Sequence, residues 1–420
     1  MSILLINSSD LHGGAARAAF RLHKGLQKIG LDSRMLVGDK LSDDPTVLGP
    51  PSKFQKGIAL MRPTLDSLPL YRYGSKATAL IYSVNYLPDG IMRVVNQMNH
   101  DIVHLHWLGK GYVNPQTLRR FRKPILWTLH DMWAFTGGCH YDLECGRYQD
   151  SCGACPQLES KRMHDLSRCA WNRKNKAWTG INLTIVSPSR WLANCAQQSS
   201  LLMQSRVEVI PNGIDTHLYK PVDKKIARQI LNLPSDRQLL LFGAIGAGTD
   251  RRKGIHHLQA ALQKISLSEN HNNMDLVCFG SYRFSPEIER SFKTHVLGVL
   301  NDDISLALAY AAADVFVSPS VQENLSNTVM ESLACGTPCV AFNIGGMSDL
   351  IDHQRNGYLA EPFNIEDLSR GLMWVMNEGR RSNDLSRNAR LKVEQSFDIN
   401  DIAARYKALY QQLAAASPQD

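Results

Sequence analysis

Hydrophobic positions along the chain follow two alternating patterns. Short apolar runs, which are typical of buried strands, are separated by longer segments whose apolar residues recur at helical spacing. The first pair is "SILLIN" (2–7) and the segment 15–29, in which apolar residues share one helical face and Gly30 ends the helix. Gly13 and Gly14 lie between them. Strand, glycine turn and helix in this order predict the start of a doubly wound α/β domain.

The alternation continues through the chain and restarts once. It predicts further strands at 33–38, 101–107, 124–131, 183–189 and 206–215, a new strand at 237–247, and a last helix at about 398–414. We therefore predict two doubly wound α/β domains, one at 1–205 and one at 206–396. The helix within 397–420 should pack back on the N-terminal domain. Ligands of such folds bind at the carboxyl ends of strands, so we expect a central cleft that both domains face.

Residues 50–95 break this regularity. They mix apolar and basic residues, as in "FQKGIALMRPTLDSLPLYRYG" (54–74). A peripheral membrane patch has this composition, and so does a buried helical excursion. The pattern favours the buried helix.

Composition and charge narrow the class of protein. The 420 residues are 44% hydrophobic and 20% charged, which is typical of a well-cored soluble chain of two domains. Neither a signal peptide nor an apolar run of membrane-spanning length is apparent, so we expect a cytoplasmic protein. The formal charge of +8 favours anionic partners such as nucleotide phosphates or lipid head groups. Aromatic patches of the RNA-binding kind are not evident, so nucleic acid is not expected.

Four of the nine cysteines lie in one loop at 137–157, namely Cys139, Cys145, Cys152 and Cys155. The last two form C-x-x-C, a spacing that lets two thiolates reach one tetrahedral ion, while the first two are separated by five residues. The loop is either a structural zinc site or a segment with incidental thiols. Catalytic zinc is not favoured, because four cysteines would close the coordination sphere.

Several polar groups follow predicted strands, where a ligand is expected. Glycines at 13 and 14 allow a ligand to approach the backbone, and His130 can bond a sugar hydroxyl. The run Arg251, Arg252, Lys253 lies between a strand and a helix, as a clamp for a diphosphate would. A plain turn, a structural histidine and a solvated charge run are the alternatives.

The stretch "SVQENLSNTVMESLACGTP" (320–338) places Glu323 and Glu331 around the start of a helix that Gly336 and Pro338 end. Eight helical residues turn through about 800°, an offset of about 80°, so both carboxylates can face the same cleft. Free amides at the helix start can hold phosphate or sugar oxygens. Glu331 can accept hydrogen bonds from ribose hydroxyls.

These residues resemble the sequence motifs of a known enzyme family. The run "AAADVFVSPSVQENLSNTVMESLACGTPCVAFNIGGMSDLI" (311–351) resembles the donor-binding signature of glycosyltransferase family 4, retaining enzymes of GT-B fold with two Rossmann-like domains. "IPNGID" (210–215), "RKG" (252–254), "GGAARA" (13–18) and "TLHD" (128–131) resemble other elements of that family. The cysteine-rich loop is similar to that of bacterial transferases that build exopolysaccharide, such as the colanic acid enzymes.

The resemblance implies that 1–205 is the acceptor-side domain and 206–396 the donor-binding domain, and it implies a role for each matching residue. Glu331 would bind the nucleotide ribose, Glu323 the transferred sugar, and Arg252 and Lys253 the diphosphate, with no metal or other cofactor needed for catalysis. His130 would lie beside the reacting centre. Donor contacts would also come from Gly14 and from the amides of Asn324, Leu325 and Ser326. The sequence departs from the family at "GAIGAG" (243–248), where Gly-Arg is common, so which arginine completes the clamp stays open.

The sequence therefore predicts a retaining glycosyltransferase that uses a UDP- or GDP-sugar. Its acceptor would be a glycan or lipid-linked glycan at the inner face of the cytoplasmic membrane, held by peripheral contacts. A nucleotide-sugar epimerase of the same fold and a non-catalytic polysaccharide-binding protein are the alternatives. A dinucleotide-dependent oxidoreductase is disfavoured, because the glycines at 13 and 14 lack the full G-x-G-x-x-G.

Overall fold

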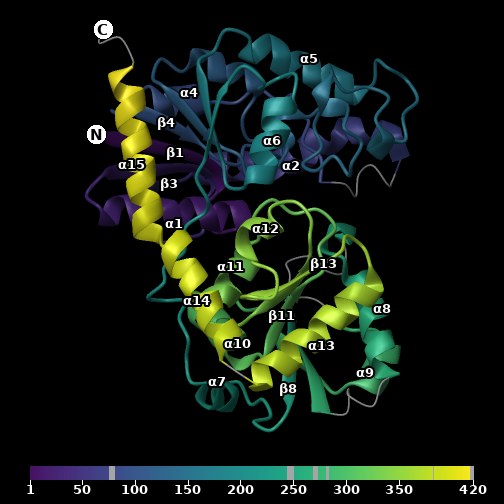
Figure 1. The fold of residues 1–420 in the computed structure, drawn as a ribbon. Coiled ribbons are helices and arrows are strands. Elements are labelled where there is room, and N and C mark those ends of the chain that lie inside the picture. The colour runs from purple at the N-terminus through teal and green to yellow at the C-terminus, as the bar shows by residue number, and fades with distance from the viewer. Residues whose placement is uncertain (75–80, 244–249, 268–272, 281–282, 382, 417–420) are drawn as a thin grey trace. The chain divides into compact units, whose positions relative to one another are not determined.

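The computed structural model describes residues 1–74, 81–243, 250–267, 273–280, 283–381 and 383–416, and the chain divides into two compact units (Figure 1). The first unit comprises Met1–Pro211 with Asn400–Asp420, and the second comprises Asn212–Ile399. The division falls at 211/212 rather than at the expected 205/206, because the strand at Arg206–Val209 pairs with the first sheet.

The first unit is built on a seven-stranded sheet with the order β3-β2-β1-β4-β5-β6-β7. Every strand pair in it is parallel. The strands are β1 (Ser2–Ser9), β2 (Asp32–Asp39), β3 (Val47–Leu48), β4 (Ile102–Leu105), β5 (Ile125–Thr128), β6 (Leu183–Ser187) and β7 (Arg206–Val209). The strand order reverses between β1 and β4, which is the switch point where such sheets bind ligands.

Helices cover both faces of this sheet. Helices α1 (Gly14–Lys28) and α15 (Ile399–Ala415) pack on one face, and α4 (Ile91–Val95), α5 (Leu166–Trp178) and α6 (Arg190–Gln198) pack on the other. Figure 1 shows the yellow helix α15 beside the purple strands of this unit. Its Tyr410 hydroxyl bonds His104 on β4 at 2.7 Å, so the C-terminal helix is tied to the sheet that begins the chain.

Helix α2 (Lys53–Ser67) attaches to the first unit through polar side chains. The guanidinium of Arg62 donates to the carbonyl of Gly111 at 2.7 Å, and Asp66 accepts from the amide of Val84 at 3.0 Å. Its apolar residues are largely exposed instead: Phe54 is 77% and Met61 60% exposed. The segment is therefore helical, but the expectation of a buried helix is wrong, because the buried side of α2 is the polar one.

The second unit is built on a six-stranded parallel sheet with the order β10-β9-β8-β11-β12-β13. Its strands are β8 (Gln238–Gly243), β9 (Met274–Phe279), β10 (Thr294–Gly298), β11 (Val315–Ser318), β12 (Cys339–Phe342) and β13 (Gly357–Ala360). One face is covered by α7 (Lys224–Ile230), α10 (Asp303–Ala312), α11 (Asn327–Ala334), α12 (Met347–Leu350) and α14 (Asp384–Ser396). The other is covered by α8 (Ile255–Ser266), α9 (Pro286–Ser291) and α13 (Ile365–Arg381).

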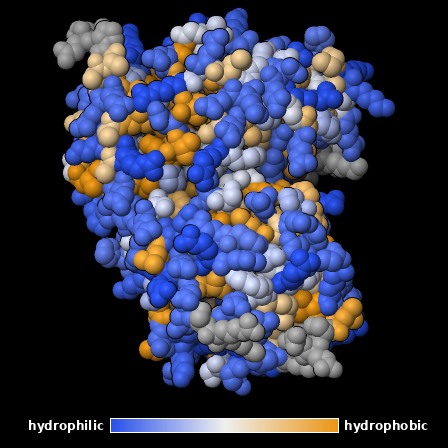
Figure 2. Space-filling view, viewed as in Figure 1, coloured by the Kyte–Doolittle hydropathy of each residue, from blue (hydrophilic) through white to orange (hydrophobic). Residues whose placement is uncertain are grey.

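Two doubly wound parallel sheets confirm the predicted α/β class. Short apolar strands such as "LLLF" are buried on both sides, which explains why they lack alternation. Across the described ranges, no helix is both long and apolar enough to cross a membrane. The face seen in Figure 2 is mostly hydrophilic on each unit, with hydrophobic residues in small groups.

Candidate active site

The loop that leaves β11 is fixed by main-chain contacts with two glycines. Gly254 has φ +66° and lies so close to the loop that a Cβ on it would stand 1.7 Å from the carbonyl oxygen of Pro319. Gly345 has φ +53°, and a Cβ there would stand 1.9 Å from the carbonyl oxygen of Glu323. Both positions need glycine for conformation and for space, so the two turns hold the loop from 319 to 323 in one place.

This contact brings Lys253 beside Glu323. The ammonium Nζ lies 2.7 Å from Oε2 of the carboxylate, and both side chains are mostly buried. Burial raises the pKa of Glu323. The charge and hydrogen bond of Lys253, together with the charge of Arg252, lower this pKa by more than burial raises it. The net pKa lies below the ordinary value, so Glu323 is ionised at neutral pH.

Of the predicted clamp, Arg252 is engaged within its own turn. Its guanidinium lies 2.6 Å from Oδ2 of Asp250, and its carbonyl accepts from the amide of Val321 at 2.8 Å. Lys253 is thus the cation that the turn presents to the β11 loop. The stretch 244–249, on which the departure from the family pattern falls, lies outside the described residues.

Helix α11 begins at Asn327, and the hydroxyl of Ser326 caps it by accepting from the amide of Val329. Glu323 therefore lies in the loop before the helix, so the helical offset of about 80° does not describe its direction, and the orientation of both carboxylates towards one cleft stays a prediction. The backbone at Ser326 is extended (ψ 115°), so the helix does not continue back towards Glu323. Leu325 packs its side chain into the core, so only its backbone can meet a ligand.

Glu331 is almost fully buried on α11, with 3% of its surface exposed. The hydroxyl of Tyr310 donates to its Oε2 at 3.0 Å. Burial, together with the charge of Glu331, raises the pKa of Tyr310 well above its usual value, so the hydroxyl stays protonated. This partner could not be predicted from the sequence, because Tyr310 looks like one more apolar residue of α10.

Asn212 is a second contact that sequence reasoning missed. Its side-chain amide donates to Oδ1 of Asn327 at 3.2 Å. The "IPNGID" segment is thereby tied to the first residue of α11, next to the amides predicted to meet the donor.

The remaining predicted site residues, His130 and Gly14, belong to the first unit. His130 follows β5, and its Nε2 lies 3.0 Å from Nδ1 of His106. Burial lowers the pKa of His130 to about 4, so its ring is neutral at pH 7. The other ring nitrogen of His106 is buried with no hydrogen-bond partner among the described residues.

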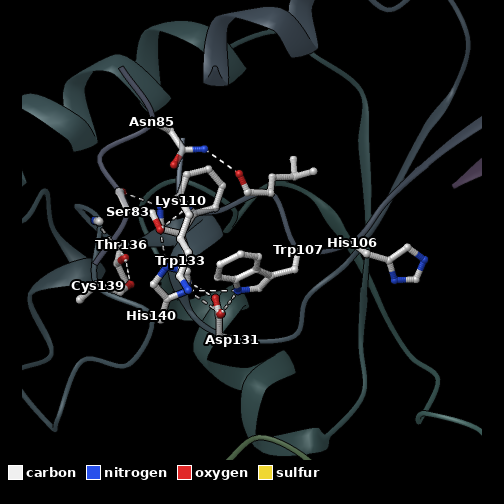
Figure 3. A network of polar contacts seen from close by, with 12 residues as sticks. Ser83, Asn85, His106, Trp107, Lys110, Asp131, Trp133, Thr136, Cys139 and His140 are labelled. Atoms are coloured by element: carbon white, nitrogen blue, oxygen red, sulfur yellow. Dashed lines mark hydrogen bonds and ion pairs between the residues drawn. The ribbon is translucent and has the colours of Figure 1, made fainter. Parts of the chain in front are cut away.

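Asp131 organises the turn that follows His130 (Figure 3). Its Oδ2 accepts from the indole of Trp107 at 2.7 Å and from Nδ1 of His140 at 2.6 Å. Its Oδ1 accepts from the amide of Trp133 at 2.8 Å. Burial raises the pKa of Asp131, but the charge and hydrogen bonds of these donors lower it below the usual value. Asp131 is therefore a positioning group, not a base.

Gly14 is the first residue of α1, and Gly13 before it has φ +93°. The glycine that the turn requires on conformational grounds is thus Gly13. A Cβ on Gly13 would meet no atom of the described residues within 4 Å, so there is open space beside this glycine.

The four cysteines of the 137–157 loop lie around one small hollow. In the described residues, no three or more histidine, cysteine or acidic side chains stand in a geometry that holds a metal ion as they are placed. The zinc hypothesis from the sequence therefore depends on the fact that all four cysteines line the same hollow.

Two family models match the chain. The model described as Glycosyltransferase Family 4 matches residues 12–218, and the model described as Glycosyl transferases group 1 matches residues 237–378. These ranges follow the two units, and together they cover most of the sequence.

Individual proteins agree with these models. A glycosyl transferase of Escherichia coli K12 named for colanic acid biosynthesis, WcaC, is 26% identical over 379 residues, which are 85% of this chain and 86% of that one. Sucrose-phosphate synthase of Thermosynechococcus elongatus matches with a TM-score of 0.69 and 22% identity, over 99% of this chain and 100% of the other. Anabaena HepE, solved with UDP-glucose, matches with a TM-score of 0.61 and 18% identity, over 98% and 100%.

Proposed function

Since the chain belongs to the glycosyltransferases of GT-B fold, with a family 4 domain followed by a group 1 domain, we propose that it transfers a sugar from a nucleoside diphosphate to a glycan or lipid-linked glycan. One observation carries this proposal. Nζ of Lys253, in the turn 251–253, lies 2.7 Å from Oε2 of Glu323, in the β11 loop that Gly254 and Gly345 hold in place. A group suited to phosphate thus stands beside a group suited to sugar hydroxyls, as the sugar–phosphate bond of such a donor requires.

The proposed roles follow from charge and position. Lys253 and the amides at 324–326 stabilise the diphosphate as it leaves, which is the largest electrostatic need of this reaction. Glu323 accepts hydrogen bonds from the transferred sugar, and Glu331 accepts them from the ribose. Arg252 adds positive charge from its own turn. These groups supply the charge that a metal would otherwise bring, and we propose that catalysis needs no metal.

We further propose that transfer retains the anomeric configuration. The acceptor oxygen bonds to the anomeric carbon on the face from which the phosphate oxygen leaves, and the acceptor proton passes to that phosphate oxygen. The neutral state of His130 supports this scheme, because a ring with a pKa of about 4 is a weak base at pH 7. His130 then bonds a sugar hydroxyl, and Gly14 lies near the diphosphate.

The exposed side of α2 supports a peripheral contact with lipid. Phe54, Ile58, Met61 and Leu65 recur at helical spacing and are 77%, 44%, 60% and 36% exposed. Lys53, Lys56 and Arg72 lie in or near this segment. An apolar stripe with flanking cations is typical of helices that lie at an anionic membrane surface. We propose that the acceptor is presented there, at the inner face of the cytoplasmic membrane.

The test is donor binding by calorimetry across UDP-, GDP- and other nucleotide-sugars. We expect wild type to bind one nucleotide, with UDP or GDP the leading candidates. Glu331→Ala should weaken that donor about tenfold to several hundredfold, because a hydrogen bond to a charged group contributes roughly 1.5–3 kcal/mol. Lys253→Ala should weaken it too. The control is Lys264→Ala, which removes an exposed ion pair with Glu366 on the same unit and should leave binding unchanged.

A folded wild-type chain that binds no nucleotide-sugar would overturn the proposal. Retention has its own readout, since proton NMR of freshly released sugar shows which anomer forms first. An epimerised nucleotide-sugar without transfer would favour the epimerase instead.

A further inference from the structure

The four cysteines of the 137–157 loop line one hollow of the first unit. The hollow measures about 10 Å³, and Tyr82, Gly137, Arg147, Gly153 and Ser167 complete its lining. That is room for about one water-sized sphere, and so for a single ion but not for an iron–sulfur cluster. Four thiols that meet from separate points of a loop are the ligand set of structural zinc sites.

Main-chain amides point at three of the sulfurs. The amide of Gly137 donates to Sγ of Cys152 at 3.1 Å. The amide of Arg147 donates to Cys145, two residues before it. The amides of Gln157 and Leu158 donate to Cys155. A protonated thiol is a weak acceptor, whereas a metal-bound thiolate is stabilised by such donors, so these bonds suit sulfurs that carry charge.

The amine of Lys174 is buried next to the hollow. Lys174 is 1% exposed, and its ammonium donates to the carbonyls of Trp133 and Thr136. The sulfurs of Cys139 and Cys152 lie within its electrostatic reach, as does Asp131. A buried ammonium is costly unless charge of the opposite sign is close. Asp131 supplies one such charge, and four thiolates around a divalent ion, with a net charge of about −2, would add to it.

The backbone of the loop is held in unfavourable conformations. Four of its non-glycine residues have positive φ: Leu143, Glu144, Cys152 and Ala154. Such a conformation is strained for a residue that carries a Cβ. A Cβ on Gly153 would stand 2.4 Å from the carbonyl oxygen of Met163, so the chain cannot easily relax. Strain of this kind persists only where other interactions over-determine the conformation.

We propose that Cys139, Cys145, Cys152 and Cys155 bind one structural zinc ion as thiolates. The thiols turn about their side-chain torsions into the hollow to complete the tetrahedron. Zinc is favoured because it takes four sulfur ligands without redox chemistry. Cys139 pairs with Tyr82 and precedes His140, which bonds Asp131. The ion thus anchors the turn that follows His130, and this role stands apart from donor binding in the second unit.

The test is the metal content of the full chain, purified without chelators and on a metal-free column, and measured by mass spectrometry. We expect about one zinc ion per chain. Cys152→Ser combined with Cys155→Ser should abolish it. The matched control is Cys169→Ser, because Cys169 lies nearby in sequence but is exposed and does not line the hollow. Control and wild type should carry the same amount of zinc.

A second measurement serves if the double variant fails to fold. Cobalt exchanged into the wild-type chain should give the intense thiolate charge-transfer bands of a tetrathiolate site, saturating at about one equivalent. Folded wild type that lacks zinc and shows no such bands would overturn the proposal. Disulfides among the four cysteines, or iron in place of zinc, would also overturn it. None of these readouts requires a donor sugar, so they stand or fall separately from the proposed function.

Discussion

The two units fix their functional loops by different means. In the second unit the β11 loop is held by main chain, through the close contacts of Gly254 with Pro319 and of Gly345 with Glu323. In the first unit the turn after His130 is held by buried side chains: Asp131 accepts from three donors, and four thiols surround a hollow beside it. One loop therefore depends on space and backbone angles, and the other on the protonation of its side chains.

This difference should be largest in the stability of the two units at acidic pH. In the first unit, burial lowers the pKa of His23 and His130 to about 4 and of His104 to about 3, and it also lowers that of His106. The described histidines of the second unit are all at least partly exposed. A histidine with a lowered folded pKa stays neutral in the fold, whereas the unfolded chain takes up a proton below about pH 6.5. Its stabilisation is thus present above pH 6.5 and is lost as the pH falls towards 4.

Each such histidine adds a slope of about 1.4 kcal/mol per pH unit, so the four together should cost the first unit several kcal/mol between pH 6.5 and 5. Six of the seven tryptophans lie in the first unit, so fluorescence reports mainly on it, while far-UV circular dichroism reports on both. The fluorescence midpoint in urea should fall more steeply with pH than the dichroism midpoint. His104→Gln should reduce that slope. Parallel shifts of both signals would contradict the comparison.

Breaking the main-chain contact of the second unit should strongly reduce donor hydrolysis. In Gly254→Ala the new Cβ cannot stand 1.7 Å from the carbonyl oxygen of Pro319, so the loop carrying Glu323 must move. Displacing reacting groups by about 1 Å can cost about 100-fold in activity. We expect donor hydrolysis to fall by at least that factor, measured with the nucleotide-sugar that wild type binds.

Gly298→Ala is the matched control for this change. Gly298 has φ +72°, similar to Gly254, but a Cβ on it would meet no atom within 4 Å. It should lose roughly 1–2 kcal/mol of unfolding free energy through backbone strain alone and keep donor binding. Equal donor loss in both variants would show that strain, not the contact, decides the effect.

The comparison also explains what the sequence could predict. Strands such as β8 and β11 are apolar runs ended by turn residues, and α11 ends at Ala334, two residues before Gly336 with φ +78°. These features are local, so the fold class and the position of the glutamate motif could be inferred from the residues alone.

Contacts between distant segments could not be inferred in this way. Nothing in "RKG" shows that Gly254 meets Pro319, or that Lys253 meets Glu323. The bond from Tyr310 to Glu331 depends on how α10 packs against α11. The mixed composition of 50–95 favours a buried helix, but composition does not show which side of α2 is attached, and in the structure Arg62 and Asp66 attach its polar side.

A smaller effect is expected from Tyr310→Phe, which removes the hydroxyl that donates to the buried Glu331. Losing a hydrogen bond to a charged group should cost about 1.5–3 kcal/mol of unfolding free energy. Glu331 should also be less well positioned, so donor affinity should fall several-fold in calorimetry. Tyr358→Phe removes a similar bond to Asp367 on the other face of the sheet. That control should lose stability and keep donor affinity; equal affinity in both variants would remove Tyr310 from the donor site.

The smallest effect should come from the ion pair of Lys253 and Glu323, and it tests whether the second unit is indeed less dependent on protonation. The folded pKa of Glu323 lies below its ordinary value, so its contribution is present above about pH 4.5 and is lost as the pH falls through the folded pKa. Lys253→Met leaves burial as the leading influence on Glu323, which raises its pKa. The variant should therefore lose stability at a higher pH than wild type, by about 1.4 kcal/mol for each unit of pKa change. Urea unfolding followed by dichroism between pH 7 and 3.5 measures this shift. Coincident curves for variant and wild type would mean that Lys253 does not hold the carboxylate ionised, and that the main chain alone shapes the loop.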